Sequence, residues 1–166
     1  MVSTTWKDQA HRLKPFNGDL IPVFDAGQRI SGKIKDHNFN VDQILDFSNL
    51  KAIELRTSLE LMCIDFDSEK AFLFAEKRGF NWAKSFTWFV QRDNQFSRVK
   101  IFFRRTVEQQ KLGEFYLNDV EHDLEVFSKS SQPVTVLGHH RESGLYRWYG
   151  SGPEHLIDCP ENVWNF

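Results

Sequence analysis

The chain has 166 residues, of which 40% are hydrophobic and 14% are aromatic, and its formal net charge is −2. This composition excludes a disordered chain, a collagen-like chain and a coiled coil. The nearly balanced charge excludes a protein that coats DNA with a uniformly basic surface, although a local basic face is compatible with it. The length is that of one domain, and a chain of this size buries enough surface to fold without disulfides.

The two cysteines, Cys63 and Cys159, do not have the spacing of a metal site. Cys63 lies in an apolar run, which predicts a buried thiol. The N-terminal sequence lacks the apolar stretch of a signal peptide, and no apolar run approaches the ~18 residues of a membrane span. We therefore expect a soluble, cytoplasmic protein with a single domain over residues 1–166.

The first third of the chain predicts only short elements. Residues 1–19 are polar and are expected to be irregular. Residues 20–24 predict a short edge strand, because Pro22 has no N–H to donate to a neighbouring strand. Residues 25–40 predict a loop, and residues 41–47 a short helix.

The middle of the chain predicts a strand, a helix and a hairpin. Residues 59–67 are strand-like, and the following helix is expected to have Ser68 as its N-cap and to end at Gly79. Residues 86–92 and 98–104 predict two strands of a hairpin, with the turn at Asp93-Asn94-Gln95.

The last third predicts a second hairpin. Residues 106–112 predict a short helix, 123–127 a strand, and 133–138 with 145–150 a hairpin over Glu142-Ser143-Gly144. Residues 151–166 are expected to form an irregular packed tail. This order of elements predicts an α+β fold with a mixed or antiparallel sheet and helices packed on one face.

The strand-like run 59–67 carries two carboxylates on one face. Side chains alternate along a strand, so Asp65 and Asp67 project side by side from its end. Two neighbouring anions need a cation or hydrogen-bond donors, and a divalent metal ion with oxygen ligands satisfies that need. In the alternative interpretation, the pair caps the next helix or faces solvent. The expected core face has Met62, Ile64 and Phe66, and the other face has Leu61, Cys63, Asp65 and Asp67.

A second acidic strand repeats this pattern. In residues 123–127, Leu124 and Val126 are expected to face the core, and Glu125 the other side, while Asp123 is expected to be an exposed residue at the strand start. If this strand pairs near the first, Glu125 joins Asp65 and Asp67. Three such carboxylates are a usual ligand set for two metal ions held ~3.5–4 Å apart in phosphoryl transfer.

The small net charge is the sum of two opposed blocks. Residues 84–111 contain seven basic and two acidic residues, and residues 112–125 contain five acidic residues and no Lys or Arg. A cationic face with an aromatic side chain suits a triphosphate or a nucleic-acid backbone, whereas a solvated sheet face is the alternative. In the strand 98–104, this face is expected to have Arg98, Lys100, Phe102 and Arg104.

The second hairpin carries a cluster of histidine, arginine and aromatic residues. Adjacent histidines on a strand point to opposite faces, so His139 and His140 do not suit a zinc site. Near a carboxylate cluster, these histidines and Arg141 suit a negatively charged substrate. Tyr146 and Trp148 share a face of the returning strand. The alternative is a polar hairpin above a packed aromatic pair.

In this order, the motifs resemble the primase–polymerase (prim-pol) family of the archaeo-eukaryotic primase superfamily, of the phage and plasmid type. MCIDFD, with Asp65 and Asp67, resembles the family strand that has two metal ligands, and DLEVF, with Glu125, resembles the strand that has the third. Gly138-His139-His140 and Tyr146-Arg147-Trp148 are similar to later family elements, with His140 the better match to the family histidine. The resemblance covers roughly residues 50–150.

One position departs from the family pattern. The family has Ser-x-His between its acidic motifs, whereas this sequence has Ser97-Arg98-Val99-Lys100-Ile101, so that Lys100 stands where the histidine would be. A lysine binds phosphate as a point charge. The family's zinc element and fused helicase have no match in the sequence, which favours primer extension over de novo priming.

The resemblance implies an RRM-like catalytic core and a metal-dependent nucleotidyltransferase that extends a nucleic-acid primer in the replication of a phage, plasmid or mobile element. It implies two Mg²⁺ or Mn²⁺ ions at Asp65, Asp67 and Glu125. It also implies nucleoside triphosphates and a DNA template and primer as partners, a separate helicase or replication protein, and a monomeric state. A nucleotide- or DNA-binding module without catalysis and a metal-dependent nuclease are the alternatives. The expected nucleotide-binding residues are Arg56, Arg98, Lys100, His139, His140 and Arg141, and the expected nucleic-acid-binding residues are Arg104 and Arg105.

Overall fold

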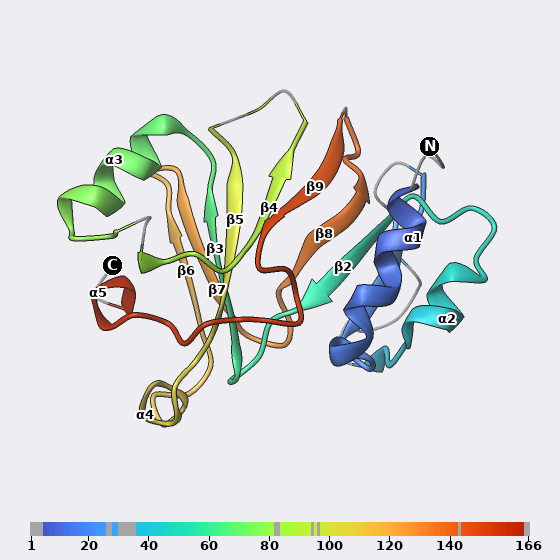
Figure 1. Cartoon of the computed structure of the whole chain (residues 1–166), viewed down its shortest axis with the longest axis horizontal. Helices are drawn as coiled ribbons and strands as arrows, with labels where there is room; N and C mark the ends of the chain where they lie inside the picture. The colour runs from blue at the N-terminus through green and yellow to red at the C-terminus, as the bar shows by residue number, and fades with distance from the viewer. Residues whose placement is uncertain are drawn as a thin grey trace.

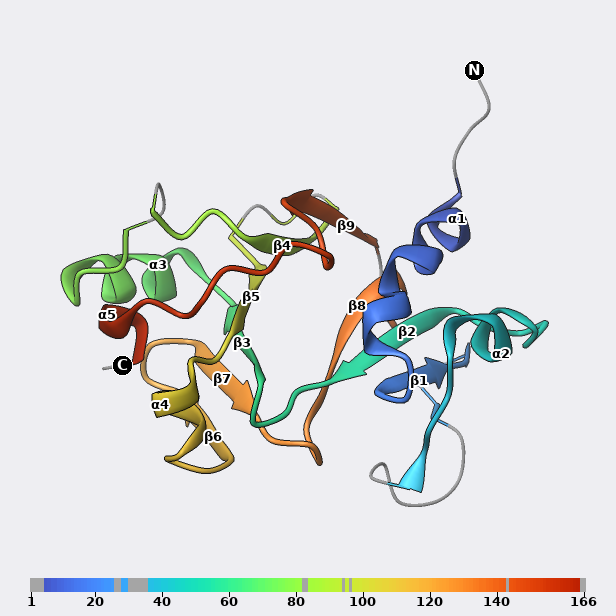
Figure 2. The same cartoon turned by 60° about the horizontal axis from the view of Figure 1, so that its bottom comes forward.

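One antiparallel sheet, built from nine strands in the described part of the chain, curls across the molecule (Figures 1 and 2). The computed structural model describes residues 5–25, 28–29, 36–81, 84–93, 95, 97–142 and 144–164. A few short helices pack against the sheet. The predicted α+β class with an antiparallel sheet is therefore confirmed.

The strand order places sequence-distant segments side by side. The order is β1-β2-β8-β9-β4-β5-β3-β7-β6, so β3 lies between β5 and β7. The edge strand β1 contains Pro22, as predicted, and both predicted hairpins form, although Asn94 and Ser143 of their turns lie outside the described residues. The strands are β1 Leu20–Val23, β2 Ala52–Arg56, β3 Leu61–Phe66, β4 Trp88–Arg92, β5 Val99–Arg104, β6 Phe115–Asp119, β7 Leu124–Ser128, β8 Pro133–His139 and β9 Leu145–Gly150.

The helices are short, and α2, α3 and α4 lie where the sequence predicts helices. The prediction of an irregular stretch over 1–19 is wrong for residues 6–16, which are helical. Thr5 and Asp8 form a capping box there, and Ala10 and Leu13 are buried. The tail is irregular except for its last turn. The helices are α1 Trp6–Ala10, the 3₁₀ helix η1 His11–Phe16, α2 Val41–Leu45, α3 Glu69–Lys77, α4 Val107–Gln110 and α5 Glu161–Trp164.

Two strands differ from the prediction, and one predicted loop can be compared with the structure only in part. The strands β2 and β6 were not predicted. All of β2 is buried, so it lacks alternation, and β6 is an exposed edge strand with no apolar stripe. The loop expected over 25–40 falls partly on residues 26–27 and 30–35, which lie outside the described residues.

Helices pack on both faces of the sheet, which corrects the expectation of a single covered face. Met62 of β3 belongs to a core that includes Ala71 of α3, whereas its neighbour Cys63 belongs to a second core that includes Ala10 of α1. Figure 1 shows α3 and α5 beside one end of the sheet and α1 and α2 beside the other. Because the sheet curls, both faces of β3 are buried.

Two smaller expectations can be checked against this fold. Cys63 and Cys159 are buried free thiols, as the apolar run predicts for Cys63. In the part of the chain that the structure describes, no helix has the length and apolar character needed to cross a bilayer.

Candidate metal and anion site

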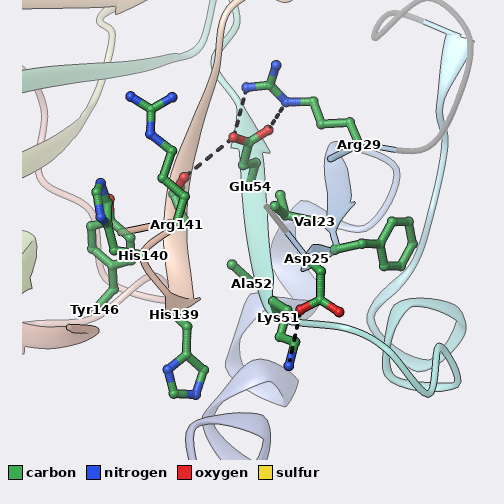
Figure 3. Close-up of a pocket in the computed structure, with 12 residues that line it drawn as sticks. Val23, Asp25, Arg29, Lys51, Ala52, Glu54, His139, His140, Arg141 and Tyr146 are labelled. Carbon is green, nitrogen blue, oxygen red and sulfur yellow. Dashed lines mark hydrogen bonds and ion pairs between the residues drawn. The ribbon is translucent and has the colours of Figure 1, made fainter. Parts of the chain in front are cut away.

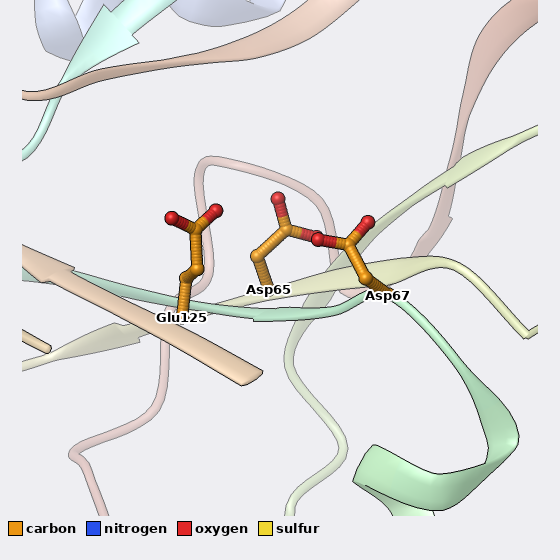
Figure 4. Close-up of side chains that lie close together, drawn as sticks. All are labelled: Asp65, Asp67 and Glu125. Atoms are coloured by element: carbon orange, nitrogen blue, oxygen red, sulfur yellow. The ribbon is translucent and has the colours of Figure 1, made fainter. Parts of the chain in front are cut away.

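The register of three strands brings a lysine and two carboxylates into one row. Asp65 in β3 lies opposite Lys100 in β5 on one side and opposite Glu125 in β7 on the other. Directly opposed residues of antiparallel strands project to the same face of the sheet. Asp67 follows directly after β3. Figure 4 shows the carboxylates of Asp65, Asp67 and Glu125 pointing to the same side of the ribbon.

These three carboxylates converge closely enough to share a metal ion. One oxygen from each of Asp65, Asp67 and Glu125 lies within 4.8 Å of the others. The predicted convergence of the two acidic strands is confirmed, because β3 and β7 are direct neighbours in the sheet. Hard divalent cations such as Mg²⁺ favour carboxylate oxygens of this kind.

Asp65 is the most buried member of this carboxylate cluster, and one of its oxygens has no hydrogen-bond partner among the described residues. Its exposed fraction is 6%. Its Oδ2 accepts from Lys100 Nζ at 2.9 Å, whereas Oδ1 is buried and accepts no hydrogen bond from the described residues. A buried, unpartnered carboxylate oxygen is unfavourable, so this atom points to a ligand that the protein itself does not provide.

Neighbouring groups hold Asp67 and Glu125 in place, and Arg98 lies 3.9 Å from Asp67 as an ion pair. The Asp67 N–H donates to the Asp123 carbonyl oxygen at 3.0 Å, which fixes the chain where β3 ends. Burial, followed by the nearby Asp65 carboxylate, raises the pKa of Asp67. The Tyr116 hydroxyl donates to Glu125 Oε1, and this hydrogen bond raises the pKa of Tyr116 to about 12.

Asp123 lies outside the carboxylate cluster, as expected. It is exposed and directly precedes β7. Its Oδ2 accepts from the Ser68 hydroxyl at 2.8 Å. Ser68 is the N-cap of α3, as predicted, but its side chain makes no capping hydrogen bond to the helix. The pair therefore fixes the turn after β3 rather than adding a fourth ligand.

A basic cavity of about 260 Å³ adjoins the carboxylate cluster. Lys100 lies between the two regions. Burial disfavours its ammonium form, but the Asp65 carboxylate outweighs that effect, and the pKa of Lys100 is raised. The cavity is lined by Asp65, Asp67, Val90, Arg92, Arg98, Lys100, His140, Arg141 and Tyr146.

Arg92 is a cavity residue that sequence reasoning missed. It is 5% exposed, and its guanidinium contacts His140 Nδ1 at 2.7 Å and the Gln95 side chain. Neither neighbour is a carboxylate. Burial, followed by the Arg92 charge, lowers the pKa of His140. Alternation along β4 was the available signal, because Arg92 shares a face with the core residues Trp88 and Val90.

The aromatic pair of β9 divides between the cavity and the core. The ring of Tyr146 lies 5.2 Å from Lys100 Nζ and 5.9 Å from the His140 ring. Trp148 instead packs edge-on against Trp88 at 5.3 Å in the core. Of the two aromatics, only Tyr146 lines the cavity.

Two expected arginines are engaged far from the carboxylate cluster. Arg56 is 8% exposed, donates to the His37 carbonyl oxygen at 2.7 Å, and lies 3.3 Å from Asp19. Its strand, β2, does not neighbour β3 in the sheet. Arg105 is 1% exposed and donates to the Ser128 hydroxyl at 2.9 Å. Both guanidinium groups therefore bind acceptors within the protein and are not available to a nucleotide or a nucleic acid.

Arg104 and His139 also lie apart from the basic cavity. Arg104 pairs in register with Leu61, at the opposite end of β3 from Asp65, and forms an ion pair with Asp158 at 2.7 Å. His139, at the end of β8, is among the residues that line a different cavity, and its ring lies edge-on to that of Trp6 at 6.3 Å. The face that sequence alternation assigns to Arg104 is correct, but the distance along the strand separates it from the carboxylates.

This second, larger cavity, of about 510 Å³, adjoins the basic one and shares Tyr146, His140 and Arg141 with it. Figure 3 shows that several of its charges are already paired. Arg29 binds Glu54 through two contacts of 2.5 and 2.9 Å, and Lys51 lies 3.3 Å from Asp25. The smaller cavity is the better candidate for an anion, because its arginines are less compensated.

Gly138 provides a test of the backbone that positions the histidines. Its φ is +97°, and an added Cβ would lie 2.4 Å from the Lys51 carbonyl oxygen. We expect Gly138→Ala to lower the free energy of unfolding by more than about 3 kcal/mol, because positive φ and close backbone contact both oppose a side chain. Gly113→Ala is the matched control, since its φ is +82° with nothing within 4 Å, and we expect about 1–2 kcal/mol. Urea unfolding measures the free energy of unfolding of both variants. Equal decreases would contradict the close contact between Gly138 and the Lys51 carbonyl oxygen.

Neither a scan against protein-family models nor a search of curated proteins found a match for this chain.

Proposed function

We propose that this chain is a metal-dependent nucleotidyltransferase of the primase–polymerase type, which extends a nucleic-acid primer with nucleoside triphosphates. The observation that carries the proposal is the junction of two oppositely charged regions. Asp65, Asp67 and Glu125 converge at one side, and the adjoining cavity is lined by arginines. The resemblance of the sequence motifs supports the same function.

The carboxylate cluster fits a divalent metal ion. Its donors are all oxygen atoms, as Mg²⁺ and Mn²⁺ prefer, and the buried Asp65 Oδ1 has no hydrogen-bond partner among the described residues. When bound, such an ion lowers the pKa of a hydroxyl and neutralises charge on a phosphate. The chain's own contribution is to hold the three carboxylates in position through the β3–β7 pairing and the Tyr116 hydrogen bond.

The basic cavity suits the triphosphate of a nucleotide. Arg92 and Arg141 are the cations available there, because Lys100 is paired with Asp65 and Arg98 lies 3.9 Å from Asp67. In the part of the chain that the structure describes, Arg92 is buried without a carboxylate partner, and an anionic ligand would compensate its charge. A metal-bound polyphosphate has the charges that match both regions.

Primer extension is the direct test of the proposed function. We expect a labelled primer on a single-stranded template to lengthen with nucleoside triphosphates and Mn²⁺ or Mg²⁺, and not with EDTA. Arg92→Met is expected to raise the KM for nucleotide by about 10–100-fold, since charged hydrogen bonds contribute about 1.5–3 kcal/mol. Arg104→Met is the matched control, because Arg104 lies outside the cavity. No incorporation by the wild-type protein would contradict the proposal.

A binding module without catalysis is the second candidate. Lys100 Nζ lies 2.9 Å from Asp65 and offsets part of the cluster's charge without a metal ion. In that case, nucleotide or DNA binding would persist without metal-dependent incorporation. Shortening of the labelled DNA by Mn²⁺ alone would instead indicate a nuclease.

A further inference from the structure

We infer that the protein itself binds one divalent ion at Asp65, Asp67 and Glu125, because Lys100 supplies the second positive charge of the carboxylate cluster. This inference rests on the proposed function and changes the number of ions that the sequence resemblance implies. Lys100 is thereby an internal counter-ion of the cluster rather than a phosphate-binding residue.

The fold fixes Lys100 against Asp65. Lys100 lies in β5, which is paired on both sides, with β3 and with β4, and its position is directly opposite Asp65. Its side chain is 16% exposed, and Nζ lies 2.9 Å from Asp65 Oδ2. The Tyr146 ring lies 5.2 Å from the same Nζ, at a distance where an aromatic face stabilises a cation. The ammonium group therefore has two favourable neighbours that hold it in the cluster.

The charges of the cluster leave room for one divalent ion. Three carboxylates carry three negative charges, and Lys100 offsets one of them at 2.9 Å. Arg98 lies 3.9 Å from Asp67, but both side chains are 40% or more exposed, so solvent screens this longer ion pair. A single divalent ion neutralises the remaining two. A second ion would give the cluster a net positive charge beside the cavity arginines Arg92 and Arg98, where repulsion opposes it.

The carboxylate oxygens of the cluster also favour a single ion. Asp65 Oδ2 is occupied by Lys100, so Oδ1 is the atom left for a ligand. Glu125 Oε1 accepts from Tyr116, which gives this carboxylate a fixed orientation. The cluster therefore presents one unpartnered oxygen of Asp65 to a metal ion within the described residues, whereas binding one ion through each oxygen would need the Oδ2 that contacts Lys100.

Metal stoichiometry without nucleotide tests the inference. We expect calorimetric titration of the wild-type protein with Mn²⁺ to give one ion per chain, and its electron paramagnetic resonance spectrum to lack coupling between two Mn²⁺ ions. Two coupled ions per chain would overturn the inference and leave the proposed function standing. No bound Mn²⁺ would overturn the proposed function and the inference together.

Variants of Lys100 sharpen the result. In Lys100→Met, both Asp65 oxygens become available and the repelling charge is absent, so we expect the first Mn²⁺ to bind at least about tenfold more tightly and a second to become measurable. Lys100→Arg keeps the charge and should keep one ion.

Lys111→Met is the matched control, because Lys111 pairs with exposed Glu108 outside the site, and this variant should bind Mn²⁺ as the wild type does. A Lys100→Met protein that is folded by circular dichroism and binds Mn²⁺ as the wild type does would overturn the inference. If that variant does not fold, the wild-type stoichiometry decides the matter.

Discussion

Replacing Asp65 by Asn is expected to lower the free energy of unfolding by about 3 kcal/mol when metal ions are removed with EDTA. The substitution leaves the ammonium of Lys100, 16% exposed, without its carboxylate partner at 2.9 Å. Relief of repulsion from Asp67 and Glu125, whose oxygens lie within 4.8 Å, offsets only part of this loss, because Lys100 is left largely buried without its carboxylate partner. Urea unfolding followed by fluorescence measures the change.

A second substitution separates this ion pair from a general loss of packing. We expect Asp65→Asn combined with Lys100→Met to recover about 2 kcal/mol relative to Asp65→Asn alone, since removing both charges leaves neither buried and unpaired. Asp158→Asn is the matched control. Its partner Arg104 lies at 2.7 Å, but both side chains are more than half exposed, so the change should stay within about 1 kcal/mol. A double variant less stable than Asp65→Asn would contradict the pairing.

Glu125→Gln is expected to lower the rate of primer extension by about 10³-fold or more. Gln keeps the shape of the side chain and an oxygen that accepts from Tyr116, so the fold should persist. The negative charge toward a metal ion is lost, however. A catalytic metal ion contributes several kcal/mol to the transition state, and each ~1.4 kcal/mol corresponds to a factor of ten in rate.

Single-turnover rates of primer extension at saturating Mn²⁺ and nucleotide measure the effect of Glu125→Gln. A nearby glutamate, Glu121, provides the control. Glu121 is exposed in the turn between β6 and β7, so Glu121→Gln removes the same charge outside the carboxylate cluster. It should retain the wild-type rate. A Glu125→Gln protein as fast as Glu121→Gln would remove Glu125 from the set of metal ligands.

Local patterns were sufficient for most elements and for two of the three residues of the carboxylate cluster. Alternation in 59–67 places Asp65 and Asp67 together, because the two-residue period of a strand needs no knowledge of its neighbours. Ser68 and Gly79 mark the ends of α3 for a similar reason, since caps depend on a few adjacent residues. The missed strands, β2 and β6, lack such a period.

Contacts between distant segments account for the corrections. The sequence places Arg98, Lys100 and Arg104 on one strand face, but only the pairing of β5 with β3 shows which of them meets Asp65. Arg105 was expected to bind nucleic acid, yet it is buried and donates to oxygen acceptors such as Ser128 Oγ. Burial of a paired arginine depends on acceptors from other parts of the chain, which no local pattern reveals.

By itself, the sequence determined the α+β class, the two hairpins, the shared face of Asp65 and Asp67, and the opposed blocks of charge. The tertiary structure decided that Glu125 and Lys100 both lie opposite Asp65, that Arg92 lines the cavity, and that both faces of β3 are buried. The physical reason is one of range. Strand alternation and capping are set by residues a few positions apart, whereas register and sheet curl are set by packing between strands distant in sequence.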